Sequence, residues 1–222
     1  MVYLFLTPHP YYKHMEYLPL IGTVAMLNLL GAVSPGPDFV MTVKNSLRYS
    51  RRSGIFTGLG VALGLCVHLT YCAAGIGYII SKSIIVFSII KFLGAGYLFY
   101  IGISSMLDKG SALEIAEEKD NVDLTRMKSF RMGFLTNVLN PKATLFFLSL
   151  FTFVISHTTP LYVILIISFI IVATAVVWFS VVSIFFTQQK VQRAFFRFEK
   201  YINRFLGGLL VALGIKVALT LK

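Results

Sequence analysis

Apolar residues form six long runs along the chain, separated by polar gaps. The runs cover approximately residues 18–43, 54–80, 84–106, 133–155, 160–186 and 204–221. Each is close to the length of about 20 residues that a helix needs to cross the hydrocarbon layer of a membrane. Helices satisfy their own backbone polar groups in lipid, and these runs are too long and continuous for barrel strands. The pattern therefore predicts an all-α integral membrane protein with six transmembrane helices.

The composition agrees with this interpretation. Of 222 residues, 57% are hydrophobic and only 13% are charged, which leaves too little polar surface to cover a soluble domain. A net charge of +11 would suit nucleic acid if the positive residues ran along folded polar segments. They lie instead in short gaps between apolar runs, which is typical of membrane loops and argues against a nucleic-acid partner.

The distribution of positive charge predicts an orientation. The gaps after the first, third and fifth runs hold 13 of the 20 lysines and arginines, and Arg204 at the start of the sixth run adds another. The second gap holds only Lys82, and the fourth holds none. The positive-inside rule then places gaps one, three and five in the cytoplasm, with both termini outside the inner membrane.

The runs fall into two groups of three. We expect residues 1–17 to be an amino-terminal extension, since Met15 would serve as a start as well as Met1. Residues 18–106 then form a first three-helix unit and 133–222 a second. Between them, 107–132 is polar and holds six of the nine acidic residues, as expected of a cytoplasmic linker.

The two units also share sequence features. Lys91–Gly94 reads like Arg204–Gly207, and Ser34-Pro35 in the first run has a counterpart in Asn140-Pro141 in the fourth. The offsets are 113 and 106 residues, so two markers give nearly one period. Because three spans reverse the direction of the chain, the units are predicted to be inverted repeats.

Prolines interrupt the first and fourth runs. Proline inside a helix removes a backbone donor and clashes with the preceding turn. Ser34 is a suitable N-cap with Pro35 at the first helical position, and Asn140 with Pro141 repeats this arrangement. Each run is therefore predicted to be two half-helices joined at membrane depth. Paired breaks of this kind indicate a transporter's binding site, although structural kinks are the simpler alternative.

Asp38 is the only acidic residue within any of the six runs. A carboxylate in a membrane span normally faces a cavity or a partner, and Lys142 occupies the equivalent turn of the fourth run. The two are expected to pair, with a proton or the amino group of a zwitterionic substrate competing for Asp38. A purely structural cap or ion pair is the alternative. The candidate substrate-binding and coupling residues are Ser34, Pro35, Gly36, Pro37, Asp38, Asn137, Asn140, Pro141 and Lys142.

Three further polar residues are candidates for the transport pathway. Asn28 and Asn45 could donate or accept hydrogen bonds near the first break. His68, in the second run, could line the pathway or relay a proton, although a single histidine is more often bonded locally. We expect no catalytic residues, no metal ligands and no cofactor.

At these residues the chain resembles the LysE/RhtB family of amino-acid exporters. The matching segments are Ser34–Asp38, Asn45–Leu47, Gly54–Gly64, Lys91–Leu98 and Gly133–Ala143. The resemblance covers about residue 18 to the end. It implies an inner-membrane exporter of homoserine, threonine, lysine or similar amino acids, coupled to the proton gradient. The direction of transport comes only from this resemblance. Many relatives carry a Pro-Gln pair where this chain reads Phe151-Thr152-Phe153, which leaves the substrate less defined than the fold.

Other classes of protein fit less well. A metal-cation exporter of similar architecture would need several oxygen or nitrogen ligands, whereas the runs contain one aspartate and one histidine. An intramembrane enzyme would need paired aspartates, a Ser/His set or an HExxH helix. A membrane scaffold would have little use for paired broken helices. Glycines in the second, third and sixth runs suit close helix packing, within a monomer or a homodimer.

Overall fold

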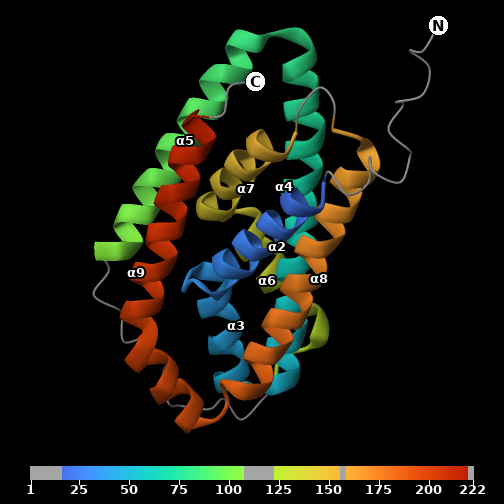
Figure 1. Ribbon diagram of the computed structural model, residues 1–222. Coiled ribbons are helices and arrows are strands. Elements are labelled where there is room, and N and C mark those ends of the chain that lie inside the picture. Colours follow the sequence, from blue (N-terminus) through green and yellow to red (C-terminus); the bar gives the residue numbers. More distant parts are fainter. Residues whose placement is uncertain (1–16, 108–122, 156–158, 220–222) are drawn as a thin grey trace, which may run out of the picture.

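A computed structural model of the chain describes residues 17–107, 123–155 and 159–219 (Figure 1). Every regular element in these ranges is an α-helix, so the predicted all-α fold is confirmed. Residues 1–16 of the predicted extension and 108–122 of the predicted linker lie outside the described residues. The helices are α2 (Leu18–Val33), α3 (Pro37–Arg48), α4 (Arg51–Lys82), α5 (Ile84–Leu107), α6 (Arg126–Val138), α7 (Pro141–Val154), α8 (Leu161–Phe185) and α9 (Gln189–Leu219).

These helices make up the six predicted spans. Four helices are long and apolar enough to cross a membrane alone, through Arg51–Ile76, Ile85–Leu107, Leu161–Phe185 and Arg197–Leu219. The other two spans are helix pairs, α2 with α3 and α6 with α7, bent by 53° and 58° at their breaks. The proline-interrupted runs are therefore the two broken spans.

The two halves run in opposite directions through the bundle. In Figure 1 the α2–α3 pair, α5 and α8 descend, whereas α4, the α6–α7 pair and α9 ascend. Each span of the first half is thus antiparallel to its counterpart in the second half. This is the relation that inverted repeats require.

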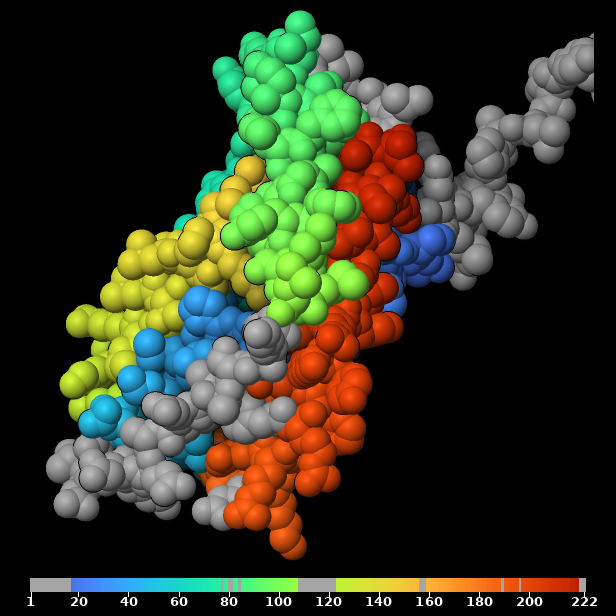
Figure 2. All heavy atoms as spheres, turned by 90° about the vertical axis from the view of Figure 1, so that its left-hand side faces the viewer, coloured from blue at the N-terminus to red at the C-terminus, as the bar shows by residue number. Residues whose placement is uncertain are grey.

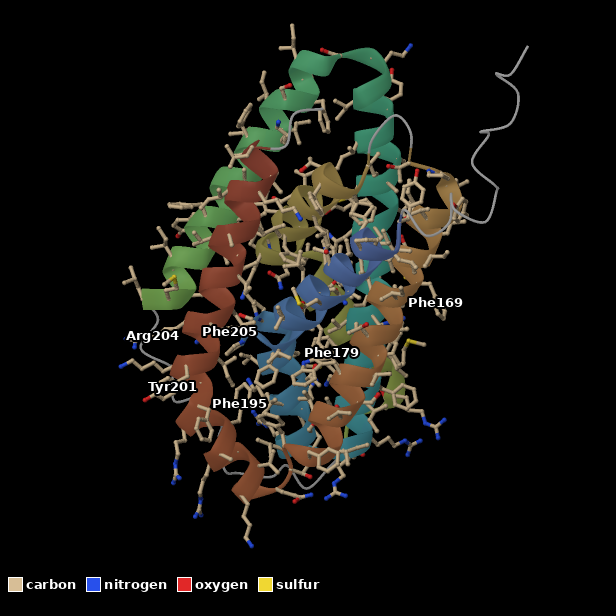
Figure 3. The ribbon with its side chains drawn as sticks, viewed as in Figure 1. Phe169, Phe179, Phe195, Tyr201, Arg204 and Phe205 are labelled. Atoms are coloured by element: carbon tan, nitrogen blue, oxygen red, sulfur yellow. The ribbon has the colours of Figure 1, made fainter. Side chains whose placement is uncertain are left out.

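One end of the bundle collects positive residues, and we call it the basic end. There α3 finishes at Arg48, α4 begins at Arg51 and α6 begins at Arg126. α9 also begins at this end, at Gln189, which is before the apolar run that starts at 204. The exposed Lys190 of α9 adds to the positive charge of this end. Figure 3 shows long, nitrogen-tipped side chains gathered at this end.

At the basic end, Asp123 joins the close of the linker to the start of α4. Its two carboxylate oxygens accept hydrogen bonds of 2.7 Å from the hydroxyls of Ser50 and Ser53. These bonds, with a smaller contribution from nearby Arg52, hold the pKa of the Asp123 carboxyl below its ordinary value. A negative charge at the amino end of α4 also complements the helix dipole.

Glycines allow two pairs of helices to approach closely. A Cβ at Gly60 of α4 would collide with the backbone of α6, and one at Gly133 of α6 would collide with the backbone of α4. Gly102 of α5 and Gly207 of α9 face each other in the same way. Figure 2 shows α5 and α9 side by side along one face of the molecule. Of the glycines that we expected to pack helices, Gly60, Gly102 and Gly207 thus do so within one chain, whereas a Cβ at Gly96 or Gly208 would meet nothing within 4 Å.

Near the basic end, three phenylalanines tie α9 to the rest of the bundle. Phe39 of α3 stacks on Phe195 of α9, with ring centroids 5.1 Å apart. Phe186, which follows α8, makes edge contacts with both rings at 5.2 and 5.0 Å. Figure 3 shows Phe195 turned inward from α9, whereas the exposed Tyr201 and Arg204 point away from the bundle.

Candidate functional site

The first break differs from its prediction by two residues. α3 begins at Pro37, and Gly36, with extended backbone, occupies the N-cap position without a side-chain hydrogen bond. Ser34 ends α2 instead of starting α3: its amide donates to the Leu30 carbonyl at 3.2 Å. The prediction of Ser34 as N-cap was wrong, because Gly36 precedes Pro37 and so avoids the helical region that a helix starting at Pro35 would require. Two successive residue–proline pairs keep Ser34 and Gly36 extended, so the helix restarts only at the second proline.

The second break follows its prediction. Asn140 is the N-cap of α7, and its side-chain oxygen accepts hydrogen bonds from the amides of Lys142 and Ala143, at 3.0 and 3.4 Å. Pro141 is the first residue of the helix, where a missing amide costs no hydrogen bond. The amino end of α7 is therefore satisfied by its own chain, unlike that of α3.

The side chains of the two breaks meet. Asp38 Oδ2 accepts hydrogen bonds from Asn137 Nδ2 at 2.9 Å and from Asn140 Nδ2 at 3.3 Å. Lys142 Nζ donates to Ser34 Oγ at 3.1 Å. Hydrogen bonds thus connect the two breaks at two places, one at Asp38 and one at Lys142. Each contact joins one half of the chain to the other, over 99 to 108 residues of sequence.

Two buried oxygen atoms in this cluster have no hydrogen-bond partner among the described residues: Asp38 Oδ1 and Asn137 Oδ1. Buried polar atoms in native proteins are nearly always hydrogen-bonded, and leaving one without a partner costs about 1–3 kcal/mol. An orphaned carboxylate oxygen calls for a donor, such as water or an ammonium group. Asp38 is the residue at which the site would accept one.

Asp38 and Lys142 line the same cavity. The cavity has a volume of about 90 Å³, well above the 10–15 Å³ or so that a single water molecule needs. Ser34, Gly36 and Asn140 line it beside them, so both breaks contribute polar groups to one space. Asn28 of α2 also lies on its wall. A pocket with opposite charges in a membrane span suits a small zwitterion better than an apolar molecule.

Sequence reasoning missed the remainder of the wall. Aliphatic and aromatic side chains from α2, α3, α4, α5, α7, α8 and α9 enclose most of the cavity, among them Leu65, Ile101, Phe146, Phe147, Phe179, Leu206, Leu209 and Leu210. Figure 3 shows Phe179 between α8 and the centre of the bundle. No signal in a single sequence separates such residues from lipid-facing ones, because both lie in uniformly apolar runs.

His68 supports the second break from behind the cavity. It is 1% exposed, and its Nε2 lies 3.0 Å from the backbone carbonyl oxygen of Asn137. Its Nδ1 lies 2.6 Å from the Tyr71 hydroxyl, and its ring stacks on Phe147 with centroids 6.2 Å apart. In the neutral form, Nε2–H donating to Asn137 leaves Nδ1 to accept from Tyr71. His68 therefore orders the backbone beside Asn137, which in turn holds Asp38.

The other two pathway candidates lie in different places. Asn28 faces the cavity, and its Nδ2 donates to the Ile171 carbonyl of α8 at 3.5 Å. Asn45 is outside the cavity wall, where its Nδ2 donates to Thr57 Oγ1 at 2.8 Å and joins α3 to α4. Across the described parts of the chain, no cluster of three or more His, Cys, Asp or Glu side chains is placed to hold a metal ion.

Comparisons with known proteins agree with this architecture. A model of the LysE type translocator family matches residues 29–221. The threonine efflux protein of Escherichia coli K12 is 28% identical over 204 residues, which cover 91% of this chain and 99% of that protein. The Salmonella typhi threonine efflux protein is 29% identical over the same coverage.

A Bacillus subtilis strain 168 membrane protein, YrhP, is 29% identical over 213 residues, or 93% of this chain and 98% of that one. No solved structure matches the chain. The family model spans the chain from the middle of α2 to its end, including both breaks. The chain therefore belongs to the LysE type translocators and is a multi-pass membrane transporter, not an enzyme.

Proposed function

We propose that this protein exports a small zwitterionic amino acid from the cytoplasm across the inner membrane, in exchange for protons. The observation that carries the proposal is that Asp38 and Lys142, which carry opposite charges, both line one cavity where the two broken spans meet. The relatives' printed names, threonine efflux proteins, support an amino acid as the substrate and export as the direction.

Asp38 would bind the substrate's ammonium group. Its Oδ2 already accepts two amide donors, which orient the carboxylate and leave Oδ1 without a partner among the described residues. An ammonium brings three donors and a compensating charge to that oxygen. The bond would satisfy a buried atom that the protein alone leaves unsatisfied.

The substrate's carboxylate would lie beside Lys142 and the amino end of α3. That end has no side-chain cap, so its first-turn amides and the helix dipole are available to an anion. Ser34 Oγ accepts from Lys142, which directs the hydroxyl proton toward another acceptor. Lys142, Ser34 and the α3 amides thus form a complementary set for a carboxylate.

The orientation of the chain decides which end of the bundle would receive the substrate. The basic end holds the starts of α4, α6 and α9, and the positive-inside rule places such an end in the cytoplasm. Both termini would then lie outside. The cavity would be loaded from the basic end, where Phe39 on its wall contacts Phe186 and Phe195.

Proton exchange needs a group that binds either a proton or the substrate. The Asp38 carboxylate meets this requirement, because protonation removes the charge that attracts an ammonium group. Entry of a proton from outside would release the substrate, and loss of the proton to the cytoplasm would restore the site. His68, held between Tyr71 and Asn137, lies on α4 behind the same break and would keep Asn137 in place during this cycle.

The test is export from cells that overproduce the protein, measured as amino acids accumulating in the medium, with and without an uncoupler. Wild-type protein is expected to raise the external level of at least one amino acid, and the uncoupler to abolish the rise. Asp38→Asn, which keeps the size but removes the charge, is expected to lower export by about 100-fold or more at unchanged membrane abundance. Export that survives this change would overturn the coupling role.

Asp123→Asn is the matched control. The substitution is the same, but Asp123 is exposed at the basic end, away from the cavity wall. Its export is expected to stay within about twofold of wild type, since exposed pairs contribute little. Equal loss in both variants would show that aspartate replacement harms the protein in general.

A further inference from the structure

The cavity is lined by two chemically different sets of residues. Four of its polar or charged lining residues, Ser34, Asp38, Asn140 and Lys142, belong to the two breaks. Away from the breaks, the described lining is aliphatic and aromatic except for Asn28. We call the part walled by Ile101 of α5, Phe179 of α8 and Leu206, Leu209 and Leu210 of α9 the apolar arm.

We propose that the apolar arm receives the substrate's side chain, so that this protein selects amino acids with aliphatic or aromatic side chains. This inference rests on the proposed transport of amino acids and adds the class of side chain. The polar part holds the ammonium and carboxylate groups common to every amino acid. Contacts between the substrate's side chain and the apolar arm therefore determine which amino acids bind.

The apolar wall of the arm favours apolar side chains over hydroxylated or charged ones. Each side-chain CH₂ that leaves water for an apolar wall strengthens binding about fourfold. A hydroxyl that enters the same space without a partner weakens binding about ten- to hundredfold. A second ammonium fares worse, because the described part of the arm carries no acidic residue. Leucine or phenylalanine should therefore be preferred to threonine, and threonine to lysine.

Asn28 is the one polar group that could favour a hydroxylated side chain. Its Nδ2 donates to the Ile171 carbonyl at 3.5 Å, which turns that end of the amide toward α8. The Asn28 side-chain oxygen can still accept a hydrogen bond from a substrate hydroxyl. The substitution Asn28→Leu therefore distinguishes substrates with a hydroxylated side chain from those with an apolar one. In a protein built for apolar side chains, Asn28→Leu is expected to lower threonine export more than leucine export, so the leucine-to-threonine ratio rises.

The experiment uses the purified full chain in liposomes under an imposed proton gradient. Efflux of leucine, phenylalanine, threonine and lysine is measured separately at equal, subsaturating concentrations. Leucine and phenylalanine are expected to leave at least about tenfold faster than threonine. Faster efflux of threonine or lysine would overturn this inference while preserving amino-acid transport. No efflux of any amino acid would overturn the proposed function as well.

Two serine variants sharpen the test. Leu209→Ser introduces a hydroxyl at the wall of the arm and is expected to lower the leucine-to-threonine ratio by about threefold or more. Ile215→Ser changes a residue of the same helix that is 48% exposed and outside the cavity wall, and its ratio should equal that of wild type. An unchanged ratio in a Leu209→Ser protein of normal abundance would overturn the assignment of the arm. A lower leucine-to-threonine ratio in a stable Asn28→Leu protein would do the same.

Discussion

The two broken spans are related by the repeat, but their second half-helices begin in different ways. α7 is capped by the Asn140 side chain, whereas α3 starts from Gly36 with no side-chain cap. The bends are nearly equal, at 53° and 58°. The same backbone device therefore serves two tasks. The side-chain amides of the second break hold Asp38, and the amino end of α3 at the first break is the end that we propose binds the substrate's carboxylate.

Among the variants that test this difference between the breaks, removal of the Lys142 charge should have the largest effect on substrate binding. Lys142→Met keeps the apolar stem but deletes the only charge that the second break adds to the cavity. The apparent affinity for substrate is expected to fall about 100-fold, as when one partner of a buried charge pair is removed. Export rates over a range of internal substrate concentrations measure this.

Lys44→Met is the control for Lys142→Met, because Lys44 is an exposed lysine of α3 near the basic end. Its concentration dependence should match wild type. An unchanged affinity in Lys142→Met would show that the substrate's carboxylate binds elsewhere.

Capping α3 should make the first break resemble the second. Gly36→Ser places a hydroxyl where it can accept from the first-turn amides, in competition with the substrate's carboxylate. The added Cβ would lie 3.6 Å from Lys142 Nζ, an ordinary contact. Export at low substrate is expected to fall about tenfold, while stability rises by only a few tenths of a kcal/mol.

Gly36→Ala adds the same Cβ without the hydroxyl and should retain most of the activity. If Gly36→Ala and Gly36→Ser fail equally, crowding of Lys142 is responsible, and the uncapped amides are not part of the site.

Removing the cap of α7 should mainly affect stability. Asn140→Ala loses the bonds to two backbone amides and one bond to Asp38, and the free energy of unfolding is expected to fall by about 1 kcal/mol. Asn140→Ser retains a cap and loses only the donor to Asp38. Thermal unfolding in detergent should therefore rank wild type above serine and serine above alanine. Equal loss in both variants would assign the effect to the Asp38 contact alone.

The smallest effect is expected far from both breaks, at Asp123. Its folded-state pKa lies below the unfolded value of 3.8, so its stabilising contribution is present above about pH 4 and disappears as pH falls through the lowered folded pKa. Asp123→Asn should cost less than about 1 kcal/mol at pH 7, because the carboxylate is exposed. Unfolding measured at pH 7 and near pH 3 should show the difference shrinking in acid, and a gap that widens in acid would contradict this.

Much of the architecture was readable from the chain because the bilayer imposes simple rules. Apolar length specified the spans, and proline in a span specified the breaks. The Asn140-Pro141 cap was predicted correctly because one asparagine precedes one proline. The first break contains two prolines, Pro35 and Pro37, and either could begin the second half-helix. Because Gly36 precedes Pro37 and keeps an extended backbone, α3 begins at Pro37.

The contacts between breaks were harder to predict. Asp38 and Lys142 are the obvious charge pair in the sequence, whereas the hydrogen bonds from Asn137 and Asn140 to the carboxylate become visible only in the structure. That geometry depends on the crossing of α4 and α6, where Gly64 also leaves room for Asn137. The apolar arm was not predictable, since Ile101 and Leu209 read like any lipid-facing residue.

The glycine crossings have a consequence for movement. Gly60 and Gly133 allow α4 of the first half to pack closely against α6 of the second. Gly102 and Gly207 do the same for α5 of the first half and α9 of the second. Any rigid-body motion that preserves these crossings must carry helices of both halves together. Each rigid unit then contains helices from both repeats. One unit is formed by α4 and α6, and the other by α5 and α9. The cavity takes wall residues from both units, so its shape changes as soon as they move apart.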